Sequence, residues 1–66
     1  MKILCNGEAR ETAAGTRVAD YLRQLGLDAS SVVVECDGKI LTREDYASHE
    51  LHDGSVLELI RFVGGG

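Results

Sequence analysis

Only one stretch of this sequence has the spacing of an amphipathic helix, and this limits the folds open to the chain. Its apolar residues recur every three or four positions, at Val18, Tyr21, Leu22 and Leu25. Thr16 stands where a hydroxyl would cap the first turn, and Gly26 stands where helix C-termini favour glycine. Because one helix cannot cover both faces of a sheet, we expect a sheet with one face covered.

The other apolar segments have the pattern of short strands separated by turns. Strands are expected over residues 1–6, 8–12, 32–36, 39–41 and 56–63. Asn6-Gly7 and Asp37-Gly38 are typical of two-residue type I′ turns, in which both positions need a positive φ. Residues 43–51 are expected to hold one helical turn. This order predicts an α+β fold, with a mixed sheet packed on one main helix.

The last strand is predicted to have two different faces. With a side-chain period of two, Leu57 and Leu59 point into the core. The positions that alternate with them, and so share the outer face, are Val56, Glu58, Ile60 and Phe62. Exposed apolar side chains beside a free tail are a candidate partner surface, unless a strand end or a loop covers them.

Three glycines, Gly64-Gly65-Gly66, follow the last strand. They cannot build a core, so we expect a domain of residues 1–63 and a flexible tail of residues 64–66. A thread without side chains can enter a channel that excludes any Cβ. Its carboxylate can there attack the α-phosphate of ATP, and a sulfur or nitrogen nucleophile can displace AMP from the acyl-adenylate. The alternative is a frayed terminus or an expression scar.

Composition disfavours several other classes of function. Seven basic and eleven acidic residues give a net charge of −4, which argues against binding nucleic acid or an anionic membrane surface. The apolar runs are too short to span a membrane, and no signal-peptide core follows Met1. Two cysteines without CxxC spacing indicate a reducing, cytoplasmic location.

The reactive side chains have plain structural interpretations. His49 and His52 supply too few ligands for a structural zinc site, so no metal is expected. Cys5 and Cys36 are expected to be buried as small apolar residues rather than to relay sulfur. No carboxylate pair is placed for acid–base catalysis and no glycine-rich loop cradles a phosphate, so we expect neither an enzyme nor a bound cofactor.

Several segments together carry a family resemblance. They are MKILCNGE (1–8), VADYL (18–22), LGL (25–27), VVVE (32–35), ILTR (40–43), LHDGSV (51–56) and IRFVGGG (60–66). With these the chain resembles, from end to end, the ThiS family of sulfur carriers of thiamine biosynthesis, in the ubiquitin-like β-grasp superfamily. Thr42 stands where the family often has proline, and Tyr46 where tryptophan is frequent. Neither departure touches the tail.

The resemblance implies that the tail is the reacting group. A ThiF-type adenylyltransferase would activate Gly66 with ATP and magnesium, and sulfur from a cysteine desulfurase would convert it to a thiocarboxylate. A ThiG-type thiazole synthase would accept that sulfur for the thiazole ring of thiamine. Gly64 and Gly65 would give the tail its clearance. The residues that would dock against the partners are Val56, Ile60 and Phe62. Exchange between partners favours weak complexes and a monomer.

Two alternatives share this fold. One is a sulfur carrier for another product, such as molybdopterin, or a carrier that also modifies proteins. The other is a ubiquitin-like interaction module with an idle tail. The identity of the acceptor enzyme distinguishes the first alternative from a thiamine carrier. Removal of Gly65 and Gly66 distinguishes the second, because an interaction module would keep its function whereas a carrier would lose sulfur transfer.

Overall fold

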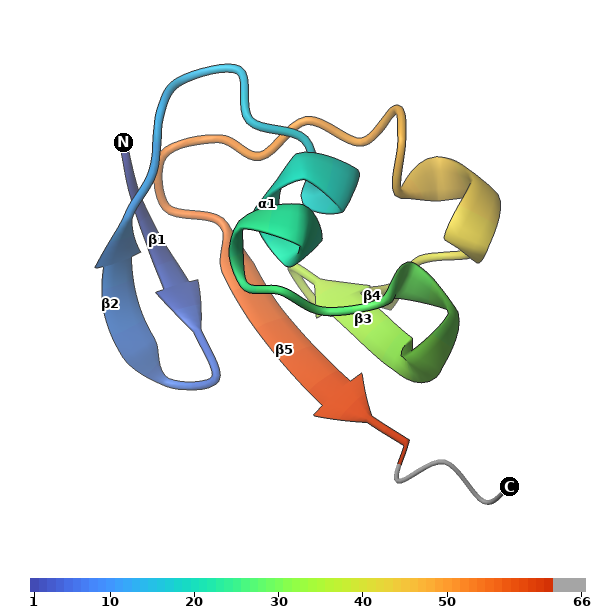
Figure 1. The fold of residues 1–66 in the computed structure, drawn as a ribbon. Helices are drawn as coiled ribbons and strands as arrows, with labels where there is room; N and C mark the ends of the chain where they lie inside the picture. Colours follow the sequence, from blue (N-terminus) through green and yellow to red (C-terminus); the bar gives the residue numbers. More distant parts are fainter. Residues whose placement is uncertain (63–66) are drawn as a thin grey trace.

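In the computed structural model, which describes residues 1–62, a five-stranded mixed sheet packs one face against a short helix (Figure 1). The strands are β1 Lys2–Cys5, β2 Glu8–Glu11, β3 Val32–Cys36, β4 Lys39–Ile40 and β5 Val56–Arg61. They lie in the order β2-β1-β5-β3-β4, with β1 and β5 parallel and the other pairs antiparallel. The predicted α+β fold is confirmed.

Both hairpins form around the predicted turns. Asn6 and Gly7, with φ of 51° and 80°, join β1 to β2. Asp37 and Gly38, with φ of 52° and 84°, join β3 to β4. Two consecutive positive φ angles match the twist of the flanking strands, so these dipeptides set the hairpin register.

Helix α1 spans Val18–Gln24, and its C-terminus follows the prediction. The Gly26 N–H donates to the Arg23 carbonyl at 3.0 Å, and the Leu27 N–H donates to the Leu22 carbonyl at 2.9 Å, which together form a Schellman motif. Leu25 was expected in the buried stripe, and that prediction is wrong. It follows the last helical residue, and 45% of its surface is exposed.

The predicted N-cap is also wrong. Arg17 is the N-cap, whereas Thr16 is buried and its hydroxyl donates to a carbonyl before the helix, 2.7 Å away. The first turn of α1 is satisfied by backbone from elsewhere in the fold: the Val18 N–H donates to the His49 carbonyl at 2.9 Å. A distant carbonyl thus takes the place of the predicted Thr16 cap, while the Asp20 carboxylate accepts from the Arg17 N–H at 3.2 Å.

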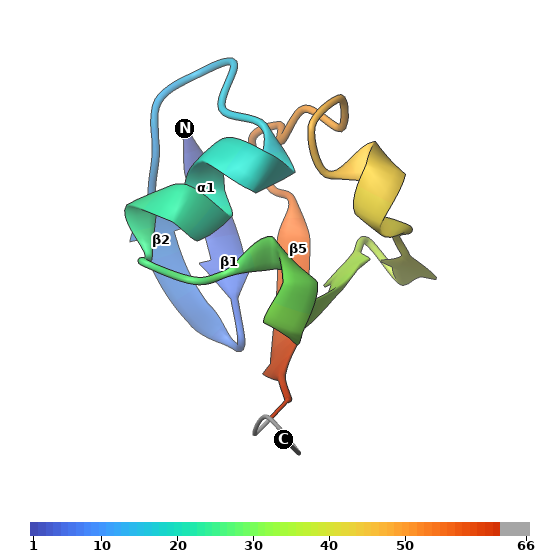
Figure 2. The ribbon, with the colours of Figure 1, turned by 45° about the vertical axis from the view of Figure 1, so that its right-hand side comes forward.

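Two short 3-10 helices lie in the connections before β3 and after β4. The first, η1 Ala29–Ser31, was not predicted, and the second, η2 Arg43–Asp45, lies in the segment expected to hold a helical turn. After η2, the buried Tyr46 donates its hydroxyl to the Val32 carbonyl at 2.9 Å. The core thus lies between the inner sheet face, α1 and the segment around Tyr46 (Figure 2). Its most deeply buried apolar residues are Ile3, Val18, Leu22, Val34 and Leu57.

Candidate functional site

The candidate site is built on β5, which lies at the centre of the sheet between β1 and β3 (Figures 1 and 2). Pairing with β3 continues to Arg61, opposite Val32. The Phe62 N–H then donates to the Ser31 carbonyl at 2.9 Å. The strand was expected to reach Val63, which lies outside the described residues; the observed β5 ends at Arg61. The chain therefore leaves the sheet from a backbone that is held through Phe62.

Asn6 supports the other edge of β5 beyond the end of β1. Its Oδ1 accepts from the Leu59 N–H at 2.8 Å, and its Nδ2 donates to the Leu59 carbonyl at 3.4 Å. One side chain thus takes the place of a paired strand residue. The sequence pattern placed Asn6 only in the turn between β1 and β2. Its hydrogen bonds to Leu59 depend on the parallel register of β1 and β5, which the sequence pattern does not contain.

The outer side of β5 is apolar and exposed. Val56, Ile60 and Phe62 are 42%, 56% and 55% exposed, whereas Leu57 on the inner side is 1% exposed. The predicted outward direction of these three side chains is confirmed, and within residues 1–62 no strand end or loop covers them. Their role in docking stays a prediction.

The sheet register places further apolar residues beside Val56, Ile60 and Phe62, which the sequence pattern did not predict. Leu4 lies opposite Val56, Val33 lies opposite Ile60, and Ile40 lies on the neighbouring edge strand. Leu4 and Ile40 are 42% and 68% exposed. We call this surface the outer apolar face; it consists of Leu4, Val33, Ile40, Val56, Ile60 and Phe62.

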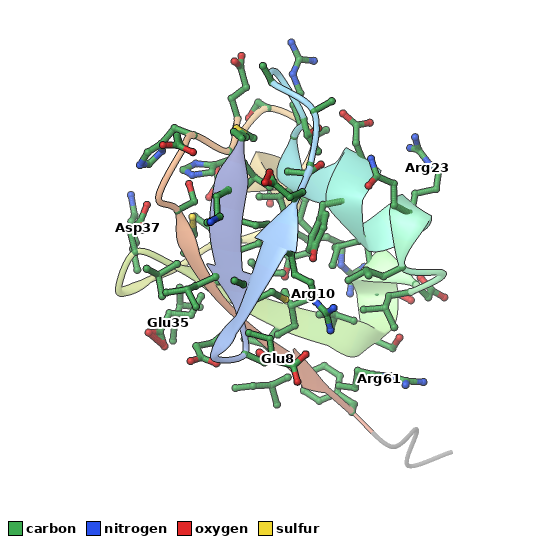
Figure 3. The ribbon with its side chains drawn as sticks, turned by 90° about the vertical axis from the view of Figure 1, so that its left-hand side faces the viewer. Glu8, Arg10, Arg23, Glu35, Asp37 and Arg61 are labelled. Atoms are coloured by element: carbon green, nitrogen blue, oxygen red, sulfur yellow. The ribbon has the colours of Figure 1, made fainter. Side chains whose placement is uncertain are left out.

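Two carboxylates interrupt the outer apolar face. Glu35 of β3 and Glu58 of β5 are directly opposed in the sheet register. Figure 3 shows Glu35 on the side of the sheet away from Arg23 of α1. Within residues 1–62, neither carboxylate forms an ion pair with a lysine or an arginine. The centre of this face is therefore negatively charged.

Both cysteines lie on the inner side of the sheet, as predicted. Cys5 is 8% exposed and Cys36 is 3% exposed. Burial, together with the neighbouring Asp37 carboxylate, raises the pKa of the Cys36 thiol to about 11. The reactive form of a cysteine is the thiolate, so this shift keeps the Cys36 thiol protonated at neutral pH.

His52 is engaged in the turn before β5. Its Nδ1 lies 3.1 Å from the Ser55 hydroxyl and its Nε2 lies 3.7 Å from the Asp37 carboxylate. Ser55 is fully buried and accepts from the His52 N–H at 2.9 Å. Among residues 1–62, no three histidine, cysteine or acidic side chains are grouped as metal ligands. The same part of the chain has no helix that could span a membrane.

The remaining predicted site residues, Gly64, Gly65 and Gly66, lie outside the described residues. The expected boundary between a 1–63 domain and a 64–66 tail lies there too. The structure thus joins the predicted docking residues on one face and leads the chain toward the glycines from the end of β5.

Comparison with known proteins points to one family. The ThiS family model matches residues 3–66, and so includes the three glycines. The sulfur carrier protein ThiS of Escherichia coli K12 is 33% identical over 66 residues, which cover all of both chains. The ThiS protein of Bacillus subtilis 168 is 39% identical over 49 residues, or 74% of each chain.

A thiazole synthase of Paramagnetospirillum magneticum is 39% identical over all 66 residues of this chain. The match covers 20% of that protein, so this chain spans about a fifth of its length. A crystal structure of the thiamine biosynthesis protein ThiS from Geobacter metallireducens matches with a TM-score of 0.85 at 32% identity, over the full length of both chains. The chain therefore belongs to the ThiS family and has its ubiquitin-like β-grasp fold.

Proposed function

We propose that this chain is a sulfur carrier for thiamine biosynthesis and that it carries sulfur as a thiocarboxylate on Gly66. The observation that supports this most directly is the family match over residues 3–66, because it includes the three C-terminal glycines. Two relatives of this family, from Escherichia coli and Bacillus subtilis, are sulfur carrier proteins.

The proposed chemistry takes place in a partner enzyme. A carboxylate oxygen of Gly66 attacks the α-phosphate of ATP, pyrophosphate leaves, and an acyl-adenylate forms. The persulfide sulfur formed by a cysteine desulfurase then attacks the acyl carbon, and AMP leaves. An excess thiol, such as the cysteine supplied, reduces the resulting S–S bond, so that one sulfur stays on Gly66 as the thiocarboxylate. ATP and magnesium are bound by the adenylyltransferase, a ThiF-type enzyme, so this chain is a co-substrate rather than a catalyst.

The folded part supports this role by presenting the tail. β5 is hydrogen-bonded on both edges near its end, through Asn6 on one side and through β3 and Ser31 on the other. Because these hydrogen bonds fix the end of β5, the chain that follows it starts from one position when Gly64 and Gly65 enter a narrow channel. The outer apolar face, which includes Val56, Ile60 and Phe62, is the proposed docking surface for the partners.

Thiazole synthase is the proposed sulfur acceptor. In the Paramagnetospirillum magneticum protein, a segment similar to this chain is part of a longer chain that is a thiazole synthase. A similar match occurs in the thiazole synthase of Magnetococcus marinus, at 35% identity over 66 residues. Covalent linkage raises the local concentration of two partners, which fits proteins that must meet during one reaction sequence.

The proposal is tested by the intact mass of the chain after incubation with ATP, magnesium, cysteine, a desulfurase and a ThiF-type adenylyltransferase. The expected product has one oxygen replaced by sulfur, mapped to Gly66, and it is absent without ATP. Deletion of Gly65 and Gly66 is expected to abolish the mass gain and to leave the melting temperature unchanged.

Two results would redirect the proposal. An unchanged mass, with enzymes that load a known carrier, would favour an interaction module with an idle tail. A loaded chain that does not support thiazole formation by a ThiG-type synthase would favour a carrier for another product or a protein modifier.

A further inference from the structure

We infer that the outer apolar face binds an adenylyltransferase that inserts a basic side chain, best an arginine, between Glu35 and Glu58. The inference rests on the proposed function, since it specifies the chemistry of the partner that acts on the tail. It starts from the register of β3 and β5, in which the two glutamates are directly opposed.

Directly opposed residues of an antiparallel pair have Cβ atoms about 5 Å apart, and like charges at such positions destabilise a sheet. The arrangement is costly in the isolated chain, because residues 1–62 supply no lysine or arginine in an ion pair with either carboxylate. Lys2 lies on the outer side of β1, but it is opposite Glu11, toward the start of β5. The carboxylate pair thus has no counterion within the described fold.

The surroundings of the pair resemble the centre of a protein interface. Exposed apolar side chains adjoin the two glutamates along and across the strands: Val56 and Ile60 flank Glu58 on β5, and Ile40 lies opposite Glu35. A partner that covers these side chains would remove water from the carboxylates, which strengthens their attraction for a buried cation. A guanidinium fits the position well, because its planar set of N–H donors can reach two carboxylates together.

Charge also argues for this occupant against a second copy of the chain. A symmetric dimer through the outer apolar face would place four glutamates, two from each copy, near one axis. By contrast, an enzyme that binds ATP needs positive charge near the place where the tail must arrive. The net charge of −4 would steer the chain toward such a surface, with Glu35 and Glu58 at the point of contact.

The test measures binding of the adenylyltransferase without ATP, by calorimetry at low and high salt, for the unaltered chain and for the double variant Glu35→Gln with Glu58→Gln. We expect the variant to bind at least about tenfold more weakly at low salt, and its affinity to depend less on salt. The control double variant Glu44→Gln with Glu50→Gln also removes two negative charges, but from η2 and the segment after it, and should bind as the unaltered chain does.

The melting temperature of the double variant provides a second test. If the two glutamates mainly stabilised the fold, their replacement would lower it. Because the substitutions remove a cross-strand repulsion, the double variant is expected to melt at a higher temperature while it binds more weakly. Glu58→Lys sharpens this test, since it creates an ion pair with Glu35 yet repels a basic partner. This variant should be at least as stable as the unaltered chain and should bind more weakly than the double variant.

Equal affinity and equal salt dependence of the unaltered chain and the double variant would overturn the inference. So would absence of binding by the unaltered chain, or its dimerisation through this face in sedimentation experiments. Binding is measured without ATP, so a chain that binds as expected but gains no sulfur in the mass assay contradicts the proposed function alone.

Discussion

The two sides of β5 carry similar apolar side chains but have opposite surroundings. On the inner side, Leu57 is 1% exposed beneath α1, whereas Ile60 on the outer side is 56% exposed. Both residues would be assigned to a core by hydrophobicity alone. The difference arises because residues 1–62 form one α-helix, which covers one sheet face. The inner side therefore maintains the fold, whereas the outer side stays exposed.

The largest expected effect separates the two sides by stability. Leu57→Ala should lower the free energy of unfolding by about 2–5 kcal/mol, because it leaves a cavity in the core. Ile60→Ala should cost about 1 kcal/mol or less, since more than half of the residue is already exposed. Urea unfolding followed by circular dichroism measures both.

Leu57→Met is the control for a core variant that fails to fold, because it keeps the volume and should cost less than about 1.5 kcal/mol. An Ile60→Ala variant as unstable as Leu57→Ala would contradict the comparison, because it would mean that the outer side is packed in solution.

The second prediction concerns chemical access to the inner side. With a pKa of about 11 against an ordinary value of 9.0, the thiolate fraction of Cys36 is about a hundredfold lower at pH 8 than for an exposed cysteine. In a Cys5→Ala background, modification by a disulfide reagent should be slower by at least that factor, and fast in urea.

The same shift predicts a pH dependence of stability. The folded pKa lies above the unfolded value, so the contribution from Cys36 is fully present below about pH 9 and is lost as the pH rises toward 11. Fast modification of Cys36 in the folded chain at pH 8 would show that the inner side opens readily.

The third prediction addresses the polar residue on the inner side. Ser55 is fully buried, and its hydroxyl accepts from the His52 N–H. Ser55→Ala should lower the unfolding free energy by about 1–3 kcal/mol, because that N–H loses its acceptor. Ser48→Ala removes an exposed hydroxyl and should change it by less than about 0.5 kcal/mol. Similar melting temperatures for the two variants would show that the buried hydroxyl is dispensable.

The smallest expected effect concerns the turn that places Tyr46 over the inner side. Hydrogen bonds from the Thr42 hydroxyl and N–H hold the pKa of Asp45 below its ordinary value of 3.8. Its contribution to stability is therefore present above about pH 4 and is lost as the pH falls through the lowered pKa. The melting temperatures of the unaltered chain and Asp45→Asn should differ at pH 7 and converge in acid. A difference that persists at the lowest pH would assign the effect to something other than this carboxylate.

The sequence by itself predicted the turns, strands and helix end that depend only on residues close together in the chain. Asn6-Gly7 and Asp37-Gly38 formed the predicted turns, because both require only a positive φ at two positions. Val32–Cys36 is the predicted strand, and Gly26 ends α1 as expected. The alternation along β5 correctly assigned Leu57 to the core and Val56, Ile60 and Phe62 to the outer side.

Tertiary structure alone decided what depends on distant parts of the chain. The first turn of α1 is satisfied by the His49 carbonyl rather than by Thr16, and Asn6 supports β5 through the parallel register. The opposition of Glu35 and Glu58 likewise exists only once β3 and β5 are paired. Turns, helix ends and side-chain alternation depend on residues close together in the sequence, so the sequence predicts them. Strand register brings together residues that are far apart in the sequence, so only the folded structure shows which of them are paired.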